Sequence, residues 1–267
     1  MTAYEECKVF EGKTAIITGG SSGIGEATAW HLARGGAKVA LLSRGEEDIK
    51  EVASQLRAAG FTAMPFSADI SNYDSMVNVA EQVMDEWGHI DYLFANAGIN
   101  GVWAPIEELD VAEWNKTIDV NINGTYYTIK AVYPHMKDRG GSIVVTASIN
   151  GTRTFSNTGA TAYASTKAAQ VAMTKMLAIE FAPHQVRINV VCPGSIDTEI
   201  EESTDRQDLE EARMGVQYPK GKIPLTGKDP GTSAEVAQVV GFLFSDAASH
   251  VTGTEMWIDG GQSLLMG

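Results

Sequence analysis

The fold is decided by the stretch Lys13-Thr-Ala-Ile-Ile-Thr-Gly-Gly-Ser-Ser-Gly-Ile-Gly25, in which a short apolar run leads through glycines into a helical pattern. Glycines let a backbone approach a pyrophosphate closely, and the N-terminus of the following helix offers free N–H groups. The glycines are spaced G-x-x-x-G-x-G rather than G-x-G-x-x-G. Placement after the first strand favours a dinucleotide-binding turn over an ordinary tight turn. Its candidate residues are Gly19, Ser21, Ser22, Gly23, Ile24 and Gly25.

The rest of the chain continues this alternation of short apolar runs and helical patterns. The predicted strands are Thr14–Thr18, Lys38–Leu42, Thr62–Phe66, Tyr92–Ala95, Ser142–Ala147, Arg187–Val191 and Glu255–Ile258. Helical patterns occupy residues 23–35, 46–59, 73–87, 110–137, 161–182 and 233–245. Such alternation predicts βαβ units, and strands that are apolar throughout are typical of a sheet covered on both faces. We therefore predict an α/β, doubly wound, three-layer fold with a seven-stranded, mostly parallel sheet.

Residues 195–230 interrupt the alternation. This stretch is polar and contains Pro219, Pro224 and Pro230. A long irregular segment inside a compact domain is usually functional. No repeat or domain-sized linker is visible, so we predict a single domain over residues 1–267 with a substrate lid inserted at 195–230.

The amino-acid composition limits the classes of partner and compartment that fit this chain. A chain of 267 residues that is 44% hydrophobic can bury a sizeable core. The formal net charge of −14 disfavours nucleic acid and anionic membranes as partners, because both attract clustered Lys and Arg. No apolar run reaches membrane-spanning length, and the N-terminus lacks the features of a signal peptide. The two cysteines, Cys7 and Cys192, fit a reducing compartment, with Cys192 as a small core residue. We expect a cytoplasmic protein without a metal site.

The sequence Tyr163-Ala-Ser-Thr-Lys167 opens a predicted helix and offers a proton donor with a cation one turn away. A nearby ammonium lowers the pKa of a tyrosine from about 10 toward the range needed for general acid–base catalysis. The spacing alone does not select this pair, because five of the eight tyrosines have a lysine four residues on: Tyr4/Lys8, Tyr126/Lys130, Tyr133/Lys137, Tyr163/Lys167 and Tyr218/Lys222.

Ser148 selects among these pairs. It follows the predicted strand Ser142–Ala147, so its hydroxyl is expected in the crevice beyond the carboxyl ends of the strands. There it would hold a substrate oxygen and stabilise developing charge. Only Tyr163 follows that strand and opens the next helix. The loop over residues 150–161 is expected to shape the substrate entrance.

The end of the second strand bears on the choice of coenzyme. An acid about 20 residues after the glycine turn usually holds the ribose 2′-hydroxyl of NAD. Here the strand is followed by Ser43-Arg44, and arginine pairs with a 2′-phosphate. This favours NADP(H). Glu46, Glu47 and Asp48 follow closely and keep NAD(H) as the alternative.

The order of these features resembles the short-chain dehydrogenase/reductase family, in its single-domain Rossmann form. The resemblance runs from about Gly12 to Gly261. The elements that carry it are Thr18-Gly19-x-x-x-Gly23-x-Gly25, Asp69, Asn96-Ala97-Gly98, Asn121, Ser148, Tyr163-x-x-x-Lys167, Pro193-Gly194 and Ile258-Asp259-Gly260-Gly261. Two departures are visible. Ala95 stands where the family usually has asparagine, and Ser148 and Tyr163 lie slightly further apart than the family spacing.

The resemblance implies further cofactor contacts. Asp69, with Ile70 beside it, would bind the adenine amino group. The alternative interpretation is that this acid caps the next helix. Asn96, Ala97 and Gly98 would lie under the cofactor. Lys167 would also bind the nicotinamide ribose. Pro193 and Gly194 would border the nicotinamide, and Ile196 and Thr198 would contact its carboxamide.

Asn121 lies in Asp119-Val-Asn-Ile-Asn-Gly124, where asparagine and glycine are poor helix formers. By resemblance it belongs to the catalytic set Asn121, Ser148, Tyr163 and Lys167. Its carbonyl would hold a water that links Lys167 to solvent. The segment Ile258–Gly261 would pack across a subunit axis, which implies a homotetramer.

The function expected from this set is NADP(H)-dependent interconversion of a ketone and a secondary alcohol, with Tyr163 as general acid/base. The alternatives are an NAD-dependent alcohol, polyol or sugar dehydrogenase, or a 3-oxoacyl reductase. The last is disfavoured because acyl carrier protein is acidic, as is this chain. A non-catalytic nucleotide-binding protein and a lyase or epimerase on the same scaffold also remain open.

Overall fold

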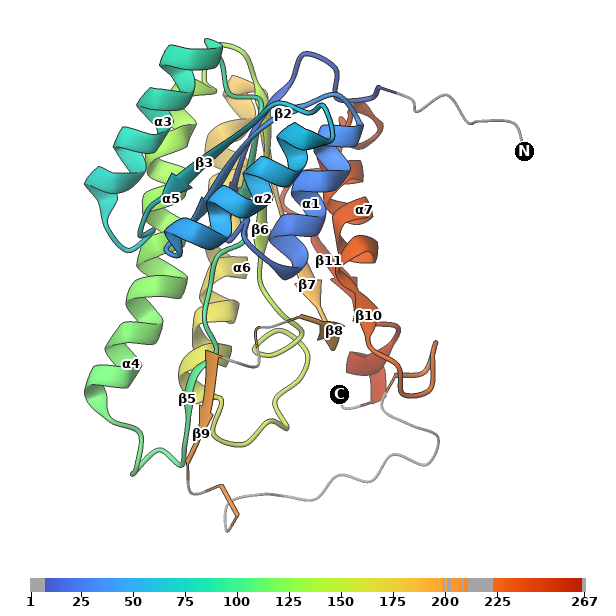
Figure 1. Cartoon of the computed structure of the whole chain (residues 1–267). Coiled ribbons are helices and arrows are strands. Elements are labelled where there is room, and N and C mark those ends of the chain that lie inside the picture. The colour runs from blue at the N-terminus through green and yellow to red at the C-terminus, as the bar shows by residue number, and fades with distance from the viewer. Residues whose placement is uncertain (1–7, 199, 201–202, 208, 211–222, 266–267) are drawn as a thin grey trace.

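A parallel sheet of seven strands forms the middle layer of the molecule (Figure 1). The computed structural model describes residues 8–198, 200, 203–207, 209–210 and 223–265. The strands are β1 (Thr14–Thr18), β2 (Lys38–Ser43), β3 (Ala63–Ser67), β4 (Tyr92–Ala95), β6 (Gly141–Thr146), β7 (Val186–Pro193) and β11 (Glu255–Ile258). Each lies within two residues of a predicted strand.

The strand order β11-β7-β6-β4-β1-β2-β3 confirms the doubly wound arrangement. The chain builds outward from β1 to β3, then returns to the other side of β1 with β4. The order therefore reverses between β1 and β4. In an open α/β sheet, a crevice for ligands forms beyond the carboxyl ends of the strands at such a reversal.

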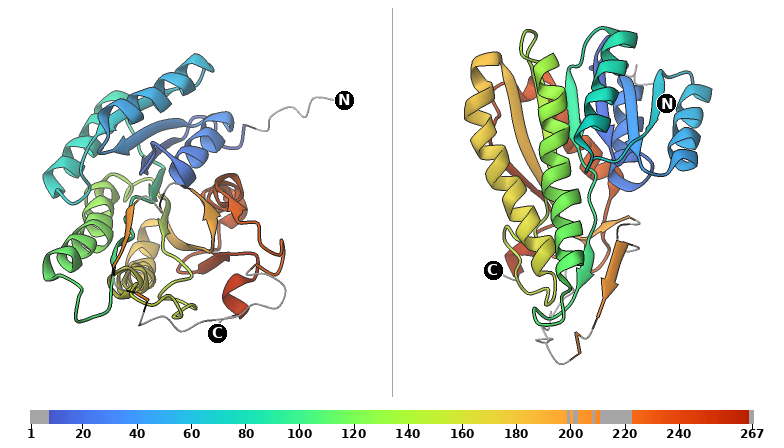
Figure 2. Two further views of the ribbon diagram at one scale, coloured as in Figure 1. Left: turned by 60° about the horizontal axis from the view of Figure 1, so that its bottom comes forward. Right: turned by 90° about the vertical axis from the view of Figure 1, so that its left-hand side faces the viewer.

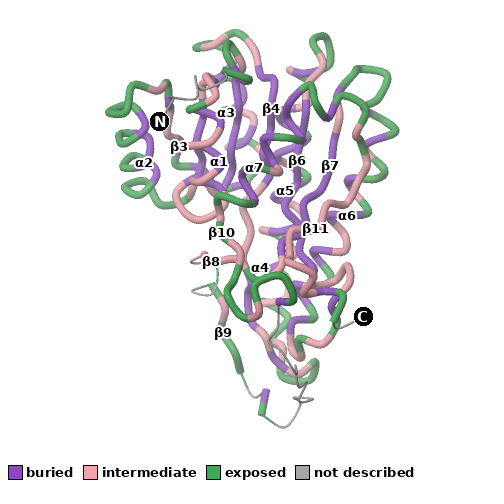
Figure 3. Tube along the Cα trace, turned by 90° about the vertical axis from the view of Figure 1, so that its right-hand side faces the viewer, coloured by how far each residue is buried: buried purple, intermediate pink, exposed green. Residues whose placement is uncertain are grey.

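Helices cover both faces of the sheet, which gives three layers (Figures 1 and 2). On one face lie α1 (Gly23–Arg34), α2 (Glu46–Ala58) and α7 (Ser233–Phe244), and on the other lie α3 (Tyr73–Trp87), α5 (Gly124–Val132) and α6 (Thr161–Phe181). The side chains of neighbouring strand residues pack against helices on opposite faces of the sheet. Ile16 packs in the same cluster as Val79 of α3, whereas Ile17 packs with Leu32 of α1. Figure 3 shows the buried residues concentrated in the sheet and on the inner sides of the helices.

Side-chain caps set where several helices begin. Asn72 accepts a hydrogen bond from the Ser75 amide at the start of α3. Thr232 and Glu235 form a reciprocal capping box at the start of α7. Each such cap contributes about 1 kcal/mol to stability. Across the residues that the structure describes, no helix combines the length and apolarity needed to cross a bilayer.

The single helix predicted over residues 110–137 is wrong in its interior. The segment comprises α4 (Val111–Ile118), the π-helical turn η1 (Asp119–Asn123), α5 and the 3₁₀ turn η2 (Tyr133–His135). The Gly124 amide donates to the carbonyl of Asp119, five residues back, which defines the π turn. Pro134 lacks an amide hydrogen and fits the tighter terminal turn.

The segment 195–230 is more ordered than predicted in its described parts. β8 (Ile196–Asp197) pairs with β10 (Gly231–Thr232), and β9 (Thr204–Arg206) pairs with β5 (Gly101–Trp103). No strand was predicted at any of these four places. The β5–β9 pair lies beyond the carboxyl ends of the main sheet, at the bottom of Figure 1. The remaining short 3₁₀ turns are η3 (Ala182–His184), η5 (Asp246–Ala248) and η6 (Gln262–Leu265).

Candidate active site

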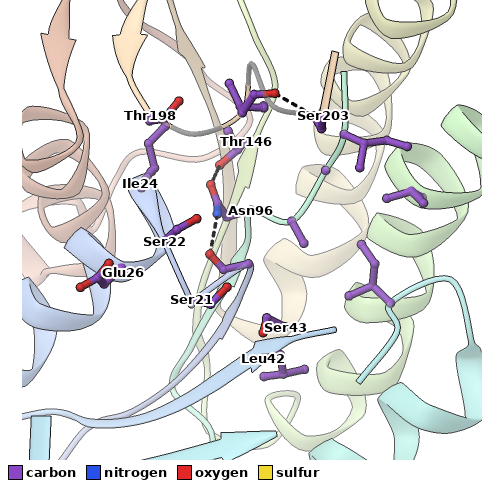
Figure 4. Close-up of a pocket in the computed structure, with 18 of the residues that line it drawn as sticks. Ser21, Ser22, Ile24, Glu26, Leu42, Ser43, Asn96, Thr146, Thr198 and Ser203 are labelled. Carbon is purple, nitrogen blue, oxygen red and sulfur yellow. Dashed lines mark hydrogen bonds between the residues drawn. The ribbon is translucent and has the colours of Figure 1, made fainter. Parts of the chain in front are cut away.

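A cavity of about 860 Å³ opens at the carboxyl ends of the strands, at the reversal of strand order (Figure 4). Its volume lies in the range of about 300–1,000 Å³ that small-molecule sites occupy. All but one of the predicted cofactor residues line it: Gly19, Ser21, Ser22, Gly23, Ile24, Ser43, Arg44, Asp69, Ile70, Asn96, Ala97, Gly98, Tyr163, Lys167, Pro193, Gly194, Ile196 and Thr198. The exception is Gly25, which lies behind the turn.

The glycine turn fits a phosphate group. A Cβ at Gly25 would lie 1.9 Å from the carbonyl oxygen of Gly19, so only glycine lets the helix start this close to the turn. Gly23 has a φ of +53°, a left-handed conformation that favours glycine. Ser22, the N-cap of α1, makes no side-chain capping bond. The first amides of α1 therefore remain available to an anion.

Hydroxyl groups tie the ends of three strands together beneath the cavity. Thr18 Oγ1 accepts hydrogen bonds from the amides of Asn96 (3.0 Å) and Ala97 (3.1 Å). Thr146 Oγ1 donates to Asn96 Oδ1 at 3.0 Å (Figure 4). The ends of β1, β4 and β6 are thus held in register. Sequence reasoning assigned no site role to Thr18 or Thr146, although a hydroxyl at the last position of a strand is the available signal.

The outer end of the cavity carries the charged groups. Arg44 lies there beyond β2, with its carbonyl accepting from Ser67 Oγ. Glu46 forms an ion pair with Lys50, which lowers the pKa of that carboxyl. Asp48, one of the acids that keep NAD(H) as the alternative, also lines the cavity. So do three charged or polar residues that were not predicted: Glu26, Glu51 and Gln55.

Asp69 makes local contacts as well as lining the cavity. Its Oδ1 accepts from the amide and the hydroxyl of Ser71, at 2.9 and 2.7 Å. The cap of α3 is Asn72, so the alternative expectation that Asp69 caps this helix is wrong.

The inner end brings Ser148, Tyr163 and Lys167 together. All three are buried, with exposed fractions of 7%, 7% and 3%. The expectation that Lys167 lowers the pKa of the Tyr163 phenol is wrong for this structure. Burial is the largest influence and raises that pKa, and the hydrogen bond with Ser148 opposes this shift. Ser148 Oγ also accepts from the Asn150 amide at 3.1 Å. The phenol therefore stays protonated at neutral pH and is oriented by a hydroxyl that a substrate oxygen can share.

Lys167 lies one turn further along α6. Its Nζ donates to the carbonyl oxygen of Thr146 at 2.9 Å and lies 5.5 Å from the centroid of the Tyr163 ring. Burial lowers the pKa of Lys167 to about 8. The charge of this ammonium is therefore sensitive to pH close to neutrality.

The other tyrosine–lysine pairs differ in their surroundings rather than in spacing. Lys130 Nζ lies 5.5 Å from the Tyr126 ring and Lys137 Nζ lies 5.1 Å from the Tyr133 ring. Neither lysine is buried. Tyr4/Lys8 and Tyr218/Lys222 each include a tyrosine outside the described residues. Burial beside Ser148 is what distinguishes Tyr163.

Asn121 lies in the π turn but does not line the cavity. Its side chain pairs with the Ile99 backbone, donating to the carbonyl and accepting from the amide, both at 2.9 Å. Its own carbonyl accepts from Thr125 Oγ1 (2.8 Å) and Gln170 Nε2 (2.9 Å). Because these two donors take both lone pairs, the structure does not support the expected relay water on this carbonyl.

The substrate end is the part of the cavity near Ser148 and Tyr163. The Trp103 ring lies 6.3 Å from the Tyr163 ring, measured between centroids, and the Arg206 guanidinium lies 5.4 Å from the centroid of the Trp103 ring. Among the described residues, Ile99, Val120, Ile200 and Ser203 also line the cavity. None of these was named individually from the sequence, although Ile200, Ser203 and Arg206 lie within the predicted lid 195–230. Cys192, by contrast, is buried in the core as expected, and burial raises the pKa of its thiol to about 12.

Comparison with known proteins agrees with this geometry. A family model described as short chain dehydrogenase matches residues 13–209. The chain is 39% identical to the oxidoreductase UcpA of Salmonella typhimurium over 95% of both chains. A solved 3-ketoacyl-ACP reductase from Sinorhizobium meliloti is 48% identical, with a TM-score of 0.91 over 94% of this chain and 99% of its own.

A solved relative of lower identity contains a nicotinamide nucleotide. A 3-ketoacyl-(acyl-carrier-protein) reductase from Brucella melitensis, 30% identical with a TM-score of 0.84 over 95% of this chain and 99% of its own, was determined with NADH. The glycine turn, the buried Ser148–Tyr163–Lys167 cluster and these similarities lead to one conclusion: the chain belongs to the short-chain dehydrogenase family.

Proposed function

We propose that the protein is an NADP(H)-dependent oxidoreductase that interconverts a ketone and a secondary alcohol. One observation carries this proposal. A single cavity has the open helix N-terminus and Arg44 at one end and the buried Ser148–Tyr163–Lys167 cluster at the other. Binding of a dinucleotide along the cavity would place its reactive ring beside the proton donor.

The residues present fit a nicotinamide nucleotide. The turn at Gly19–Gly25 would hold the pyrophosphate, Asp69 the adenine, and Lys167 the ribose next to the nicotinamide. Thr198 Cγ2 lies 3.2 Å from the position that a Cβ would take at Gly23. Thr198 therefore lies against the glycine turn. When bound, the nucleotide supplies or accepts the hydride.

The chain's own residues supply the proton and the charge stabilisation. Ser148 donates a hydrogen bond to the substrate oxygen and polarises the carbonyl. Tyr163 transfers its phenolic proton to that oxygen, and the phenolate that remains is stabilised by the Lys167 ammonium. Since burial keeps Tyr163 protonated, the resting site is prepared for reduction of a ketone. Oxidation of an alcohol uses the same groups in reverse, starting from the phenolate.

The preference for NADP(H) rests on Arg44. Among the described residues no ion pair involves this arginine, so its guanidinium is available to a 2′-phosphate. The nearest following acid, Glu46, is paired with Lys50. Asp48 and Glu51 line the same end of the cavity and support the NAD(H) alternative.

The proposed substrate is a small ketone or alcohol, because Ile99, Ile200 and Ser203, among the described residues that line the cavity, have uncharged side chains. The described parts of the segment 195–230 cover this end. Asn100 Nδ2 donates to Thr204 Oγ1 at 2.6 Å, and β9 pairs with β5 beside Trp103. We propose that this segment is the substrate lid.

A 3-oxoacyl substrate is the second candidate, favoured by the name of the Sinorhizobium meliloti relative. Docking of an acidic carrier protein requires a basic surface. Lys137 and Arg139 are exposed, and these basic side chains support docking of the carrier protein. Glu180, which follows the exposed Ile179, opposes such docking because it is acidic. The net charge of −14 also opposes it.

We further propose that the protein is a homotetramer. Tyr126, Met176 and Ile179 are large apolar side chains exposed on α5 and α6, which run side by side in Figure 2. An exposed apolar surface of this kind marks an interface. The C-terminal segment Ile258–Gly261 would form another subunit contact. The buried Cys192 thiol fits a reducing, cytoplasmic compartment.

The deciding experiment compares initial rates with NADPH and NADH over a panel of small ketones and one 3-oxoacyl thioester, free and on its carrier protein. We expect faster NADPH consumption on a small ketone. Faster NADH consumption would overturn the coenzyme assignment. A preference for the carrier-bound substrate would establish the 3-oxoacyl reductase. Tight nucleotide binding without turnover would support a non-catalytic protein, and product without net NADPH consumption would indicate a lyase or epimerase.

A further inference from the structure

Gln170 is a buried polar residue that no step of the proposed reaction uses. It lies on α6, three residues after Lys167, and is 1% exposed. Its Nε2 donates to the Asn121 carbonyl at 2.9 Å and to Thr125 Oγ1 at 2.8 Å. Because a carbonyl oxygen only accepts, the amide nitrogen must be the atom that faces it. The orientation of Gln170 is therefore determined by its partners.

Gln170 is connected to the cavity indirectly, by its hydrogen bond to Asn121. A π turn breaks the regular helical ladder, and here the side chains of Gln170 and Thr125 bind the carbonyl of Asn121 within it. The same residue uses its amide group to hold both the N–H and the C=O of Ile99. Ile99 lines the cavity, whereas Asn121 and Gln170 do not.

A residue selected for packing alone at this position would be apolar. Gln170 Oε1 is buried without a hydrogen-bond partner among the described residues, as is Thr174 Oγ1 one turn later on the same helix. An unpaired buried amide oxygen is costly. An acceptor and a hydroxyl at this spacing are suited to binding one buried water. The donor side of Gln170 has two partners, the Asn121 carbonyl and Thr125 Oγ1, so the hydrogen bonds of this side chain to the protein all run toward the π turn.

We propose that Gln170 is a positioning residue for the substrate end of the cavity. By donating to the Asn121 carbonyl it fixes the π turn, so that Asn121 holds Ile99 where this residue lines the cavity. This inference rests on the proposed function.

Two substitutions test the donor role of Gln170. Gln170→Met preserves length but donates no hydrogen bond. We expect it to lower kcat about 30-fold, as a small misplacement of reacting groups does. The nucleotide Kd should change by less than about threefold, because most nucleotide contacts lie at the other end of the cavity. The matched control is Gln238→Met on the exposed side of α7, which should behave as wild type.

Gln170→Glu provides a readout that a purely structural role would not change. A carboxylate cannot donate to the Asn121 carbonyl, whereas a protonated carboxyl can. Burial raises the pKa of a carboxyl group. We therefore expect kcat of this variant to rise as pH falls from 9 to 6, approaching within about threefold of wild type. Because Lys167 titrates near pH 8 in every variant, the readout is the ratio of each kcat to that of wild type. This ratio should rise as pH falls for Gln170→Glu and stay constant for Gln238→Met.

Three results would overturn the inference. One is wild-type kcat and pH dependence in both Gln170 variants. Another is a loss of thermal stability in Gln170→Met with unchanged kcat of the folded enzyme, which would show packing alone. The third is an experimental structure in which a water binds the Asn121 carbonyl and the Gln170 amide is turned away.

A parallel Tyr163→Phe variant separates this inference from the proposed function. If Tyr163→Phe retains wild-type turnover, the proposed function fails. Hydrogen exchange at the Ile99 amide then tests Gln170 without any activity measurement. Exchange about tenfold faster in Gln170→Met is expected, because the amide loses a fixed acceptor. Unchanged exchange at Ile99 would overturn the positioning role.

Discussion

The two ends of the cavity are built in different ways. At the outer, nucleotide end, many residues lie where a strand of the main sheet ends, as Gly19 does after β1 and Arg44 after β2. At the substrate end, contacts join segments far apart in sequence. Asn100 bonds to Thr204, 104 residues away, and Trp103 packs near Tyr163. The nucleotide end is therefore a property of local sequence, whereas the substrate end depends on how distant segments meet.

The largest effect is expected at the inner end of the cavity, where the proposed reaction depends on the Tyr163 side chain. Tyr163→Phe removes the proton donor, so kcat should fall by about 10³-fold, within the usual contribution of general acid–base catalysis. Nucleotide affinity, measured by fluorescence titration, should change less than about twofold. Tyr126→Phe, at an exposed tyrosine with a lysine four residues on, is the control. Equal turnover in the two variants would contradict the assignment of Tyr163.

Gly25→Ala should disrupt nucleotide binding. The new Cβ would lie 1.9 Å from the Gly19 carbonyl, so the turn must move. We expect a loss of about 100-fold in nucleotide affinity, because the helix N-terminus shifts away from the phosphate. Gly20→Ala is the matched control in the same turn, since its nearest contact would be 3.3 Å, to Leu41. Calorimetric titration of both variants decides between local strain and a general effect on the turn.

Arg44→Ala sharpens the coenzyme assignment. Loss of a charge-assisted bond to the 2′-phosphate should weaken NADPH binding about 30-fold and leave NADH binding within about twofold. The exposed Arg139 provides a control of equal charge at a distance. If both coenzymes weaken equally, Arg44 does not read the 2′-phosphate.

The substrate end should respond selectively to Trp103. Trp103→Ala removes the ring beside Tyr163 and should raise KM about tenfold for the preferred ketone, with nucleotide affinity unchanged. Trp103→Phe keeps an aromatic surface and loses only the indole N–H that donates to Asn100. It should retain most of the specificity. An increase in nucleotide Kd in Trp103→Ala would show that the two ends are not independent.

The pH dependence provides a test that needs no substitution near the substrate. The pKa of Lys167 is lowered to about 8, so its charge is lost above that pH and kcat/KM for reduction should fall about tenfold per pH unit. Stability has the opposite dependence. Between pH 8 and about 10.4 the unfolded chain binds the proton that the folded chain has released, so the free energy of unfolding should rise with pH. Lys167→Met should lack both dependences. Their persistence in that variant would assign them to another group.

The main features of the site were predictable because their signals are local. Ser148, Tyr163 and Lys167 were selected by a strand end followed by a helix start, and the structure places all three together. The role of Asn121 was not predictable in the same way. Its carbonyl is occupied by Gln170, a residue 49 positions away that has no recognisable pattern of its own.

The sequence by itself determined the seven main strands, most of the helices, the parallel α/β class and the main residues of the nucleotide end. The physical reason is that apolar periodicity, glycine turns and helix starts act over a few residues. Only the tertiary structure decided the π turn at Asn121, the pairing of β5 with β9 and the approach of Trp103 to Tyr163. These depend on which buried hydrogen bonds and side-chain contacts distant segments make once the sheet has brought them together.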